Sequence, residues 1–461
     1  MSTFFGINIA LSSLLAQQRA LDVIGNNVAN VNTPGYHRQE AVLRAGEPYP
    51  PAGATASLMG GQYGSGVEVE MIRRTQSAYL DLQARTAKQE AAQWQSTHDA
   101  LQEVETIITQ TSDSNLGTLL DGFWNAWQDL SANPEELSAR VNVRQQGIAL
   151  TEAIRTMVAD LRQSQAGIDL QLKGKVDEVN RLAAEVASLN QQIAAVQGEG
   201  KQPNDLLDQR DQALSQLSEL IGITAYATDR GDVIVNVGAR PLIQGGESYA
   251  IEAATRADGH IELRWQEDGA QVNLQSGEML GMISVRDTAI PGYLAQLDAL
   301  ATNLISAVNA VHQTGYGLDG STGNDFFTGT GAADIDVSAA VQADARVVVA
   351  ASTADAPGDG SLALQIAQVR DQALVGGLTL NEAFRSLATD VATATSNAED
   401  TLAAKQLSLQ QVTQNQQSLY GVSLDEEMTN MIAYQHAYAA AARLMSTLDD
   451  MLQTLIEKTG A

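Results

Sequence analysis

Cysteine is absent from this chain of 461 residues, which excludes disulfide bonds and metal sites built on thiolates. Aromatic residues are scarce, at 5% of the sequence, whereas the ligand pockets of enzymes are typically lined by aromatic and apolar side chains. Basic residues are also few, because 27 Lys and Arg stand against 55 Asp and Glu, giving a net charge of −28. Nucleic acid and anionic membranes repel such an acidic chain, and we expect neither as a partner.

Long apolar runs and catalytic motifs are missing as well. No uninterrupted apolar stretch approaches the roughly 18 residues of a membrane-spanning helix, and no basic segment precedes an apolar core at the N-terminus. The sequence therefore predicts no membrane span and no cleavable signal peptide. The five histidines are scattered outside any HExxH or His-x-His pattern, and no nucleophile–base pair follows from spacing. We expect no enzyme activity, no cofactor and no metal.

One loop invites a metal interpretation. Residues Asp319–Asp325 resemble a calcium-binding loop in the spacing of their acidic side chains. A bidentate acidic ligand should follow, but Thr330 occupies that position. A glycine-containing turn is therefore the favoured interpretation.

The N-terminal stretch carries the pattern of a helix that packs on another helix. Apolar residues recur there at spacings of four and three, which is typical of a coiled-coil seam. The seam positions are Ile7, Leu11, Leu14, Leu21 and Val28, with Gln18 and Gly25 in the slots between them. The helix should end near residue 31, because Thr33-Pro34-Gly35-Tyr36 has the composition of a β-turn.

The C-terminal stretch carries a matching pattern. Ser423 with Glu426 three residues later predicts a capping box at the start of a helix, and Gly460 should end it. Its seam residues are Tyr438, Ala441, Met445, Leu448, Leu452 and Leu455, preceded after one shift in register by Leu424, Met428 and Met431. A continuous helix here would be roughly 50 Å long, and we expect it to pair with the N-terminal helix.

Between the ends, the apolar period alternates between helix and strand values. We predict a mainly α protein with a small inserted antiparallel β domain, built as a long discontinuous helical bundle whose N- and C-terminal helices pair as a coiled coil. Three units follow: a terminal assembly domain (1–40 and 421–461), a helical rod-like domain (41–222 and 292–420) and a β insert (223–291). Turn residues and alternating apolar residues near 41–72 predict a β-rich arm on the rod-like domain.

Within the rod-like domain, helices are expected over 73–111, 116–130, 135–197, 203–221, 293–312, 361–375 and 379–420. Phe123, Trp124 and Trp127 should form an aromatic cluster on one of them.

The two ends resemble the bacterial flagellar axial proteins of rod, hook and hook–filament junction. The residues that carry this resemblance are Gly25–Asn30, Asn32–Tyr36, Tyr434, Gln435, Tyr438 and Ala440–Ala442. Internal segments resemble one branch, the hook-associated protein 1 family, the first junction proteins between hook and filament. These segments are Pro203–Asp211, Ile290–Tyr293, His312 with Gly315, and Asp325–Phe327. The chain is short for that family, so an outer domain is expected to be reduced or missing.

The resemblance implies a structural subunit that is exported unfolded through the flagellar type III apparatus and lies outside the cell in the flagellum. Implied partners are copies of itself in a helical ring, the hook protein, a second junction protein on the filament side, and a cytoplasmic export chaperone on the C-terminal helix. The candidate assembly and partner-binding residues are Leu11, Leu14, Leu21, Asn26, Asn27, Val28, Asn30, Asn32, Pro34, Gly35, Tyr36, Met428, Met431, Tyr434, Gln435, Tyr438, Met445, Leu448, Leu452 and Leu455.

Two alternatives remain at this point. A hook or rod axial subunit would share the same ends, although the Pro203–Asp211 stretch and the long helical middle favour the junction branch. An axial protein whose insert has become a binding or hydrolytic module is the second alternative, but residues 223–291 offer no constellation for chemistry.

Overall fold

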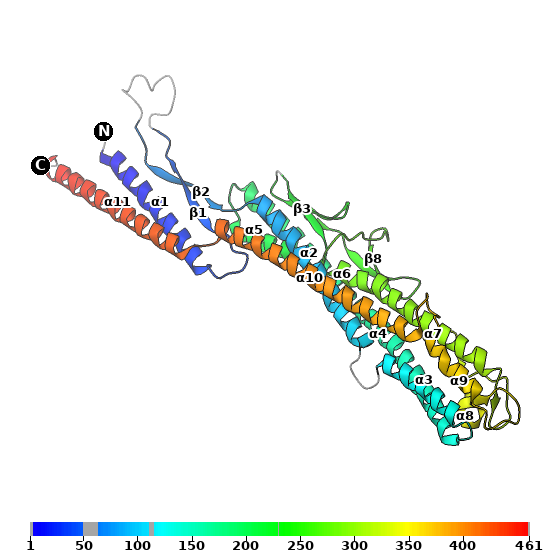
Figure 1. Ribbon diagram of the computed structural model, residues 1–461. Coiled ribbons are helices and arrows are strands. Elements are labelled where there is room, and N and C mark those ends of the chain that lie inside the picture. Colours follow the sequence, from blue (N-terminus) through cyan, green and yellow to red (C-terminus); the bar gives the residue numbers. More distant parts are fainter. Residues whose placement is uncertain (1–2, 49–62, 110–114, 229, 460–461) are drawn as a thin grey trace.

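The computed structural model describes residues 3–48, 63–109, 115–228 and 230–459, and the molecule is elongated (Figure 1). Both chain ends lie at one extremity, and helices α3, α8 and α9 lie at the other. The expected helix breakers Pro50, Pro51, Gly60 and Gly61, and the expected helix stop at Gly460, lie outside the described residues.

The first and last helices run side by side in opposite directions (Figure 1), which confirms the predicted pairing of the chain ends. They are α1, Thr3–Ala29, and α11, Leu424–Thr459. A two-stranded antiparallel sheet, β1 Gln39–Ala45 and β2 Val67–Arg74, packs against α1 and forms the base of the predicted arm. The helix expected from Arg73 begins later, because Arg73 and Arg74 still pair with Glu40 and Gln39 in this sheet.

Long helices build the body. They are α2 Ala78–Thr109, α3 Leu116–Ala132, α4 Leu137–Gly198, α5 Asn204–Leu220 and α10 Leu380–Tyr420. Helix α10 packs along α2, and α4 packs on α3 and α5. The second half of α4 carries a heptad repeat of apolar residues, and its positions Val179, Leu182, Val186 and Ile193 are buried. A full capping box of Thr379 and Glu382 starts α10, and Gly421 ends it.

The predicted antiparallel β region follows α5. A four-stranded sheet has the order β3 (Ile223–Ala227), β4 (Val233–Val237), β5 (Arg240–Gln244) and β6 (Glu247–Ser248), and a hairpin joins β7 (Ile251–Thr255) to β8 (Ile261–Trp265). Val272 and Leu274 alternate with polar residues as in a strand, but pairing here is limited to an isolated bridge between Arg264 and Gln271. Two side-chain amides of α4 hold this region: Asn180 bonds Ile251, and Asn190 bonds Val233.

The return to helix comes earlier than expected. Helix α6, Glu278–Ser284, continues through a π-helical turn, Val285–Ala289, into α7, Ile290–His312. Ile290–Tyr293, one of the segments that carry the family resemblance, therefore lies in the first turn of a helix. Pro291 has no N–H to donate, but it lies in the first turn of α7, where the wide π-helical turn before it accommodates the proline.

The segment Glu278–His312 is long and apolar enough to cross a membrane by length and composition, a test that core helices also pass. In this fold Leu297, Leu300, Leu304 and Val308 are buried in the main core, which accounts for the apolar face of α7.

The far end of the molecule is closed by short elements. They are β9 Tyr316–Gly317, β10 Phe327–Thr328, β11 Asp336–Val337, α8 Ala339–Ala343, β12 Val349–Ala351 and α9 Ser361–Gln368. The predicted aromatic cluster is confirmed here: Phe123 and Trp127 contact Phe326, with ring centroids 5.6 and 5.3 Å apart. Asp319 accepts a hydrogen bond from Ser321 within a turn, and the described residues contain no group of three acidic or histidine side chains placed to hold a metal.

Candidate assembly site at the paired chain ends

The buried side of α1 packs against both α11 and the β1–β2 sheet, and it includes several small side chains. On α1 the buried residues are Ala10, Ala16, Ala20, Val23, Ile24 and Asn27. The seam that we expected lies to one side of this line, since Leu11 is 46% exposed and Leu14, Leu21 and Val28 are half-buried. The expectation counted large apolar residues, whereas alanine at the contact lets two helices approach closely. The intramolecular seam therefore uses positions that a search for large apolar residues passes over.

Helix α11 shows how little of the terminal pair is covered by its own chain. Among its described side chains, Glu427 and Ala441 are buried. Of the predicted residues, Met431, Tyr434, Met445, Leu448 and Leu452 are half-buried, while Met428, Gln435, Tyr438 and Leu455 are exposed. Three further apolar residues that the prediction missed, Ile432, Leu444 and Met451, are about half exposed. These three residues lie outside the apolar repeat that predicts the seam, so their exposure becomes visible only in the structure.

A polar network joins the two helices at the end nearest the body. Asn27 Nδ2 donates to Glu427 Oε2 at 3.0 Å and to the carbonyl of Gln39 at 2.9 Å. Asn27 Oδ1 accepts from the backbone N–H of Gln39 (3.0 Å) and from the Tyr36 hydroxyl (2.8 Å). Arg38 Nε donates to Glu427 Oε1 at 2.8 Å, so both carboxylate oxygens of this buried side chain have donors. Asn27 and Glu427 thus lie at the centre of the site.

The predicted turn after α1 is confirmed by its geometry. The N–H of Tyr36 donates to the carbonyl of Thr33 at 3.2 Å, and Gly35 has a φ of +79°, which favours glycine at the third position of a type II turn. Pro34 and Gly35 are exposed.

Three asparagines surround this turn in different roles. Asn30 Nδ2 donates to the carbonyl of Asn26 at 3.0 Å and closes the end of α1, whereas Asn32 is exposed. Thr33 Oγ1 donates to Asn30 Oδ1 at 3.1 Å. These bonds place Tyr36 over Asn27.

The connector after the turn is anchored to the body through Asp208 of α5. His37 Nδ1 lies 2.7 Å from Asp208 Oδ1, and Arg74 Nη1 donates to the same oxygen at 2.7 Å and to Asp211 at 2.7 Å. Burial lowers the pKa of Arg74, but Asp211 and Asp208 more than offset this effect, and its pKa lies above the ordinary value. A buried guanidinium with two carboxylates therefore joins the arm, the connector and α5.

Tyr36 lies in the same polar surroundings. Burial raises the pKa of the Tyr36 hydroxyl, and the Asp208, Asp205 and Glu427 carboxylates raise it further. The phenol therefore stays protonated and able to donate to Asn27.

Two expected helix caps are modified at this site. Asn204 does not cap α5, because its Nδ2 donates to the Ile72 carbonyl at 2.9 Å. Ser423 Oγ accepts from the Glu426 N–H at 3.5 Å, while the Glu426 carboxylate pairs with Arg38 at 3.2 Å. Contacts between distant segments compete with local capping at both positions.

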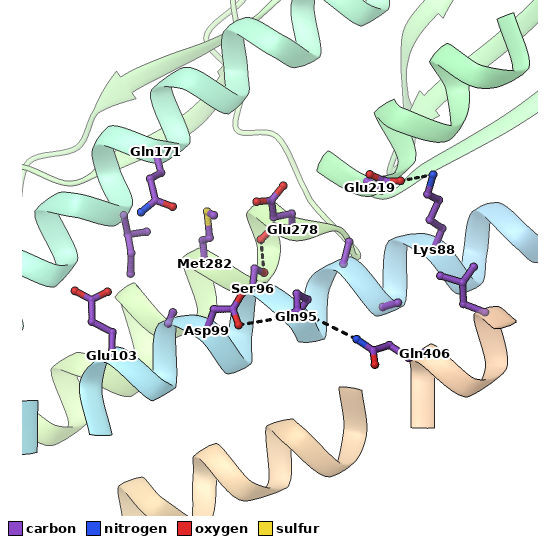
Figure 2. A pocket seen from close by; sticks show the side chains of 15 residues that line it. Lys88, Gln95, Ser96, Asp99, Glu103, Gln171, Glu219, Glu278, Met282 and Gln406 are labelled. Atoms are coloured by element: carbon purple, nitrogen blue, oxygen red, sulfur yellow. Dashed lines mark hydrogen bonds and ion pairs between the residues drawn. The ribbon is translucent and has the colours of Figure 1, made fainter. Parts of the chain in front are cut away.

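Two grooves flank α2 in the body. One, of about 530 Å³, lies between α2, α4, α6 and α10 (Figure 2). Its polar side chains already have partners: Ser96 donates to the backbone carbonyl of Glu278 at 2.8 Å, and Gln95 donates to the Asp99 carboxylate at 2.8 Å. The other, of about 580 Å³, lies beside Pro34–His37. In the second groove Lys88 Nζ donates to Ser215 Oγ at 2.9 Å and also pairs with Glu219, so these polar side chains are likewise bonded to one another.

Family models match three parts of the chain. Residues 101–327 match the model of the "Flagellar hook-associated protein FlgK helical domain". Residues 7–37 match "Flagella basal body rod protein", and residues 414–458 match "Flagellar basal body rod FlgEFG protein C-terminal". The paired ends and the helical body thus have the character of flagellar axial proteins.

Full-length relatives define the family more closely. "Flagellar hook-associated protein 1" of Bacillus subtilis (strain 168) is 31% identical over 507 aligned positions, which cover 100% of this chain and 99% of the relative. The protein of the same name in Escherichia coli (strain K12) is 25% identical over 98% of this chain and 99% of its own length. The chain belongs to the hook-associated protein 1 family of structural flagellar proteins.

A solved structure shares the fold. The flagellar hook junction protein FlgK from Burkholderia pseudomallei superposes with a TM-score of 0.66 at 16% identity, covering 75% of this chain and 100% of that one.

Proposed function

We propose that this protein is a non-enzymatic junction subunit whose copies form a helical ring between the flagellar hook and the filament. The paired ends form the inner wall of that ring and make the contacts between copies. The helical body forms the outer tube, and the β region points outward. Hook protein adjoins the ring on one side, and a second junction protein adjoins it on the filament side.

The observation that carries this proposal is the exposed apolar surface of the terminal pair. Leu11 and Leu15 on α1 and Met428, Ile432 and Met451 on α11 are each about half exposed. Exposed apolar side chains on both helices of a pair are typical of surfaces that contact other chains. A helix that buries so little against its own chain gains stability from further apolar contacts, and neighbouring copies supply them.

The path to the flagellum completes the proposal. The chain leaves the cytoplasm unfolded through the flagellar export apparatus, without a cleaved signal peptide. Before export, a cytoplasmic chaperone covers the C-terminal helix by helix-in-groove docking. Leu448→Asp is then expected to abolish both chaperone binding and assembly, because this half-buried residue belongs to the apolar surface of α11.

The test is genetic and structural. A strain lacking this protein should make hooks and release filament subunits into the medium, and the unsubstituted chain should restore filaments. Ile432→Asp should fail to restore filaments, because it places a charge on the exposed apolar face of α11. Leu170→Asp is the matched control: Leu170 is 72% exposed but lies on α4 of the body. Filaments restored equally by Ile432→Asp would contradict the proposal.

A further inference from the structure

The contact between Asn27 and Glu427 stands out because it places a carboxylate inside a seam of small apolar residues. We propose that Glu427 is a positioning residue that holds α11 on α1 in a single register. The proposal concerns the alignment of two helices within one chain, and its consequence for assembly rests on the proposed function.

Three contacts along the pair share one alignment. Asn27 bonds Glu427, and Tyr434 packs against the cluster that contains Ala20. A Cβ atom on Gly6 would lie 3.2 Å from Leu448 Cδ1. From Asn27 to Gly6 is 21 residues (27 − 6), and from Glu427 to Leu448 is also 21 residues (448 − 427). The antiparallel pair is therefore in phase over three heptads.

The packing of side chains between α1 and α11 does not strongly favour this alignment over one shifted by a heptad. The α1 residues on the contact line repeat every seven positions as Gly6, Ser13 and Ala20, all of them small. Sliding α11 by one heptad would set its side chains against residues of nearly the same size. In coiled coils, a single buried polar residue is the feature that selects one register from several of similar packing.

Glu427 has the properties of such a residue. Its side chain is 2% exposed, and each carboxylate oxygen accepts a hydrogen bond, one from Asn27 and one from Arg38. A shift by one heptad would set this carboxylate against Ala20 in one direction and beyond the end of α1 at Ala29 in the other. In both cases it loses its bond to Asn27, and a carboxylate moved into an apolar seam without partners is strongly unfavourable. This free-energy cost applies only to the shifted registers, so the Glu427 carboxylate selects the observed register.

Arg38 also fixes the position of α11 relative to the body. The N–H of Arg38 donates to the carbonyl of Tyr420, the last residue of α10. Glu427 is therefore tied to α1 through Asn27 and to the body through Arg38, directly after Gly421 interrupts the helix. The direction in which α11 leaves α10 is set at this point.

The register decides which residues form the surface offered to other copies. Leu11 and Leu15 come from α1, and Met428 and Ile432 come from α11. A shift of one heptad would move the α11 residues by about 10 Å along α1 and would change how the exposed apolar residues of the two helices are placed relative to one another.

The absence of cysteine allows a direct test in the full-length chain. Gly6→Cys is combined with Leu448→Cys to report the observed register, or with Ala441→Cys or Leu455→Cys to report a shift by one heptad either way. Rates of disulfide formation under mild oxidation are compared. The first pair should oxidise more than about tenfold faster than the other two, since in both shifted states the carboxylate has lost its hydrogen bond to Asn27.

Substitutions at position 427 should reduce that preference. In Glu427→Leu we expect the three pairs to oxidise at rates within about threefold of each other, and in Glu427→Gln an intermediate preference, because the amide still accepts from Asn27. Glu426→Gln is the matched control: the neighbouring carboxylate is 64% exposed and pairs with Arg38 alone among the described residues, so the preference should be unchanged.

The outcomes are distinct. An unchanged preference in both Glu427 variants overturns the proposal. Loss of all three disulfides in both variants also overturns it, because Glu427 would then supply pairing rather than choose an alignment. The measurement uses the free chain, so a failure of ring assembly with intact register would count against the proposed function alone.

Discussion

The ring of His37 lies stacked on the ring of Tyr420, with centroids 5.0 Å apart and planes inclined by 28°. One residue belongs to the connector after α1, and the other is the last residue of α10. The Tyr420 hydroxyl donates to Asp81 of α2 at 2.9 Å. The His37–Tyr420 contact therefore joins the connector to the body, and the hydrogen bond to Asp81 holds the Tyr420 phenol in place.

That phenol makes the junction sensitive to alkaline pH. Burial raises the pKa of Tyr420, and the hydrogen bond to Asp81 raises it further. In the unfolded chain the pKa is about 10, so the unfolded state loses its proton first as the pH rises. The stability from this residue is complete below about pH 10 and falls above it. Urea unfolding between pH 8 and 11 should show a smaller loss for Tyr420→Phe than for the unsubstituted chain, and equal losses would contradict this assignment.

Asp208 is expected to be the residue on which the connection of arm, connector and α5 most depends. Asp208→Ala leaves Arg74, whose side chain is 5% exposed, with Asp211 as its remaining carboxylate, and it removes the acceptor of His37. Breaking a buried ion pair by removing one partner costs about 3 kcal/mol or more in unfolding free energy. Chemical denaturation should show this loss. Asp205→Ala, an exposed change in the first turn of the same helix, should cost less than about 1 kcal/mol, and comparable losses would refute the role.

The far end of the body should lose stability in acid through His312. Its Nδ1–H donates to the Asn324 carbonyl at 2.6 Å, and its Nε2 accepts from the Val349 N–H at 3.3 Å, so the ring is neutral. Burial lowers the pKa of His312 to about 4. The unfolded chain takes up a proton near pH 6.5 and the folded chain does not, so stability from this residue is present above pH 6.5 and falls toward pH 4.

The His312 contribution amounts to about 2 kcal/mol between pH 7 and pH 5. His312→Asn should flatten that part of the pH profile of unfolding free energy while lowering stability at pH 7. An identical slope in the variant would mean that carboxylates elsewhere set the acid response.

The β region should be removable, provided that the cut follows the structure. The N–H of Gly222 donates to the carbonyl of Ser276 at 2.8 Å, so the chain enters and leaves this region at adjacent points. Deleting residues 223–275 with a short linker should preserve assembly, at some cost in stability because Asn180 and Asn190 lose their partners. Deleting residues 223–290 also removes α6 and the π-helical turn, and should unfold the body. Circular dichroism and filament formation separate the two results.

Periodicity and turn chemistry predicted most of the fold. The long helices, the strand-rich region and the turn at Thr33–Tyr36 follow from local spacing, because each depends on residues near in sequence. The early start of α6 escaped prediction because a π-helical turn carries the helix through Pro291. Such a turn has no distinctive residue pattern.

The candidate site was harder to predict in detail. Its location at the chain ends follows from amphipathic patterns, but the rotation of each helix does not. The apolar spacing placed Leu11 in the predicted seam, but Leu11 is exposed, whereas Ala20 and Asn27 are buried. The bond from Asn27 to Glu427 joins residues 400 positions apart, and local patterns carry no information about such a pair.

Helix α4 runs unbroken for 62 residues, a length of roughly 93 Å. A strut of that kind can lengthen or shorten only by whole turns, because any other change would rotate one end relative to the other. The length that α4 contributes along the long axis of the subunit can therefore change only in steps of a helical turn. Insertions on either side of α4 can change the size of the subunit without changing this dimension.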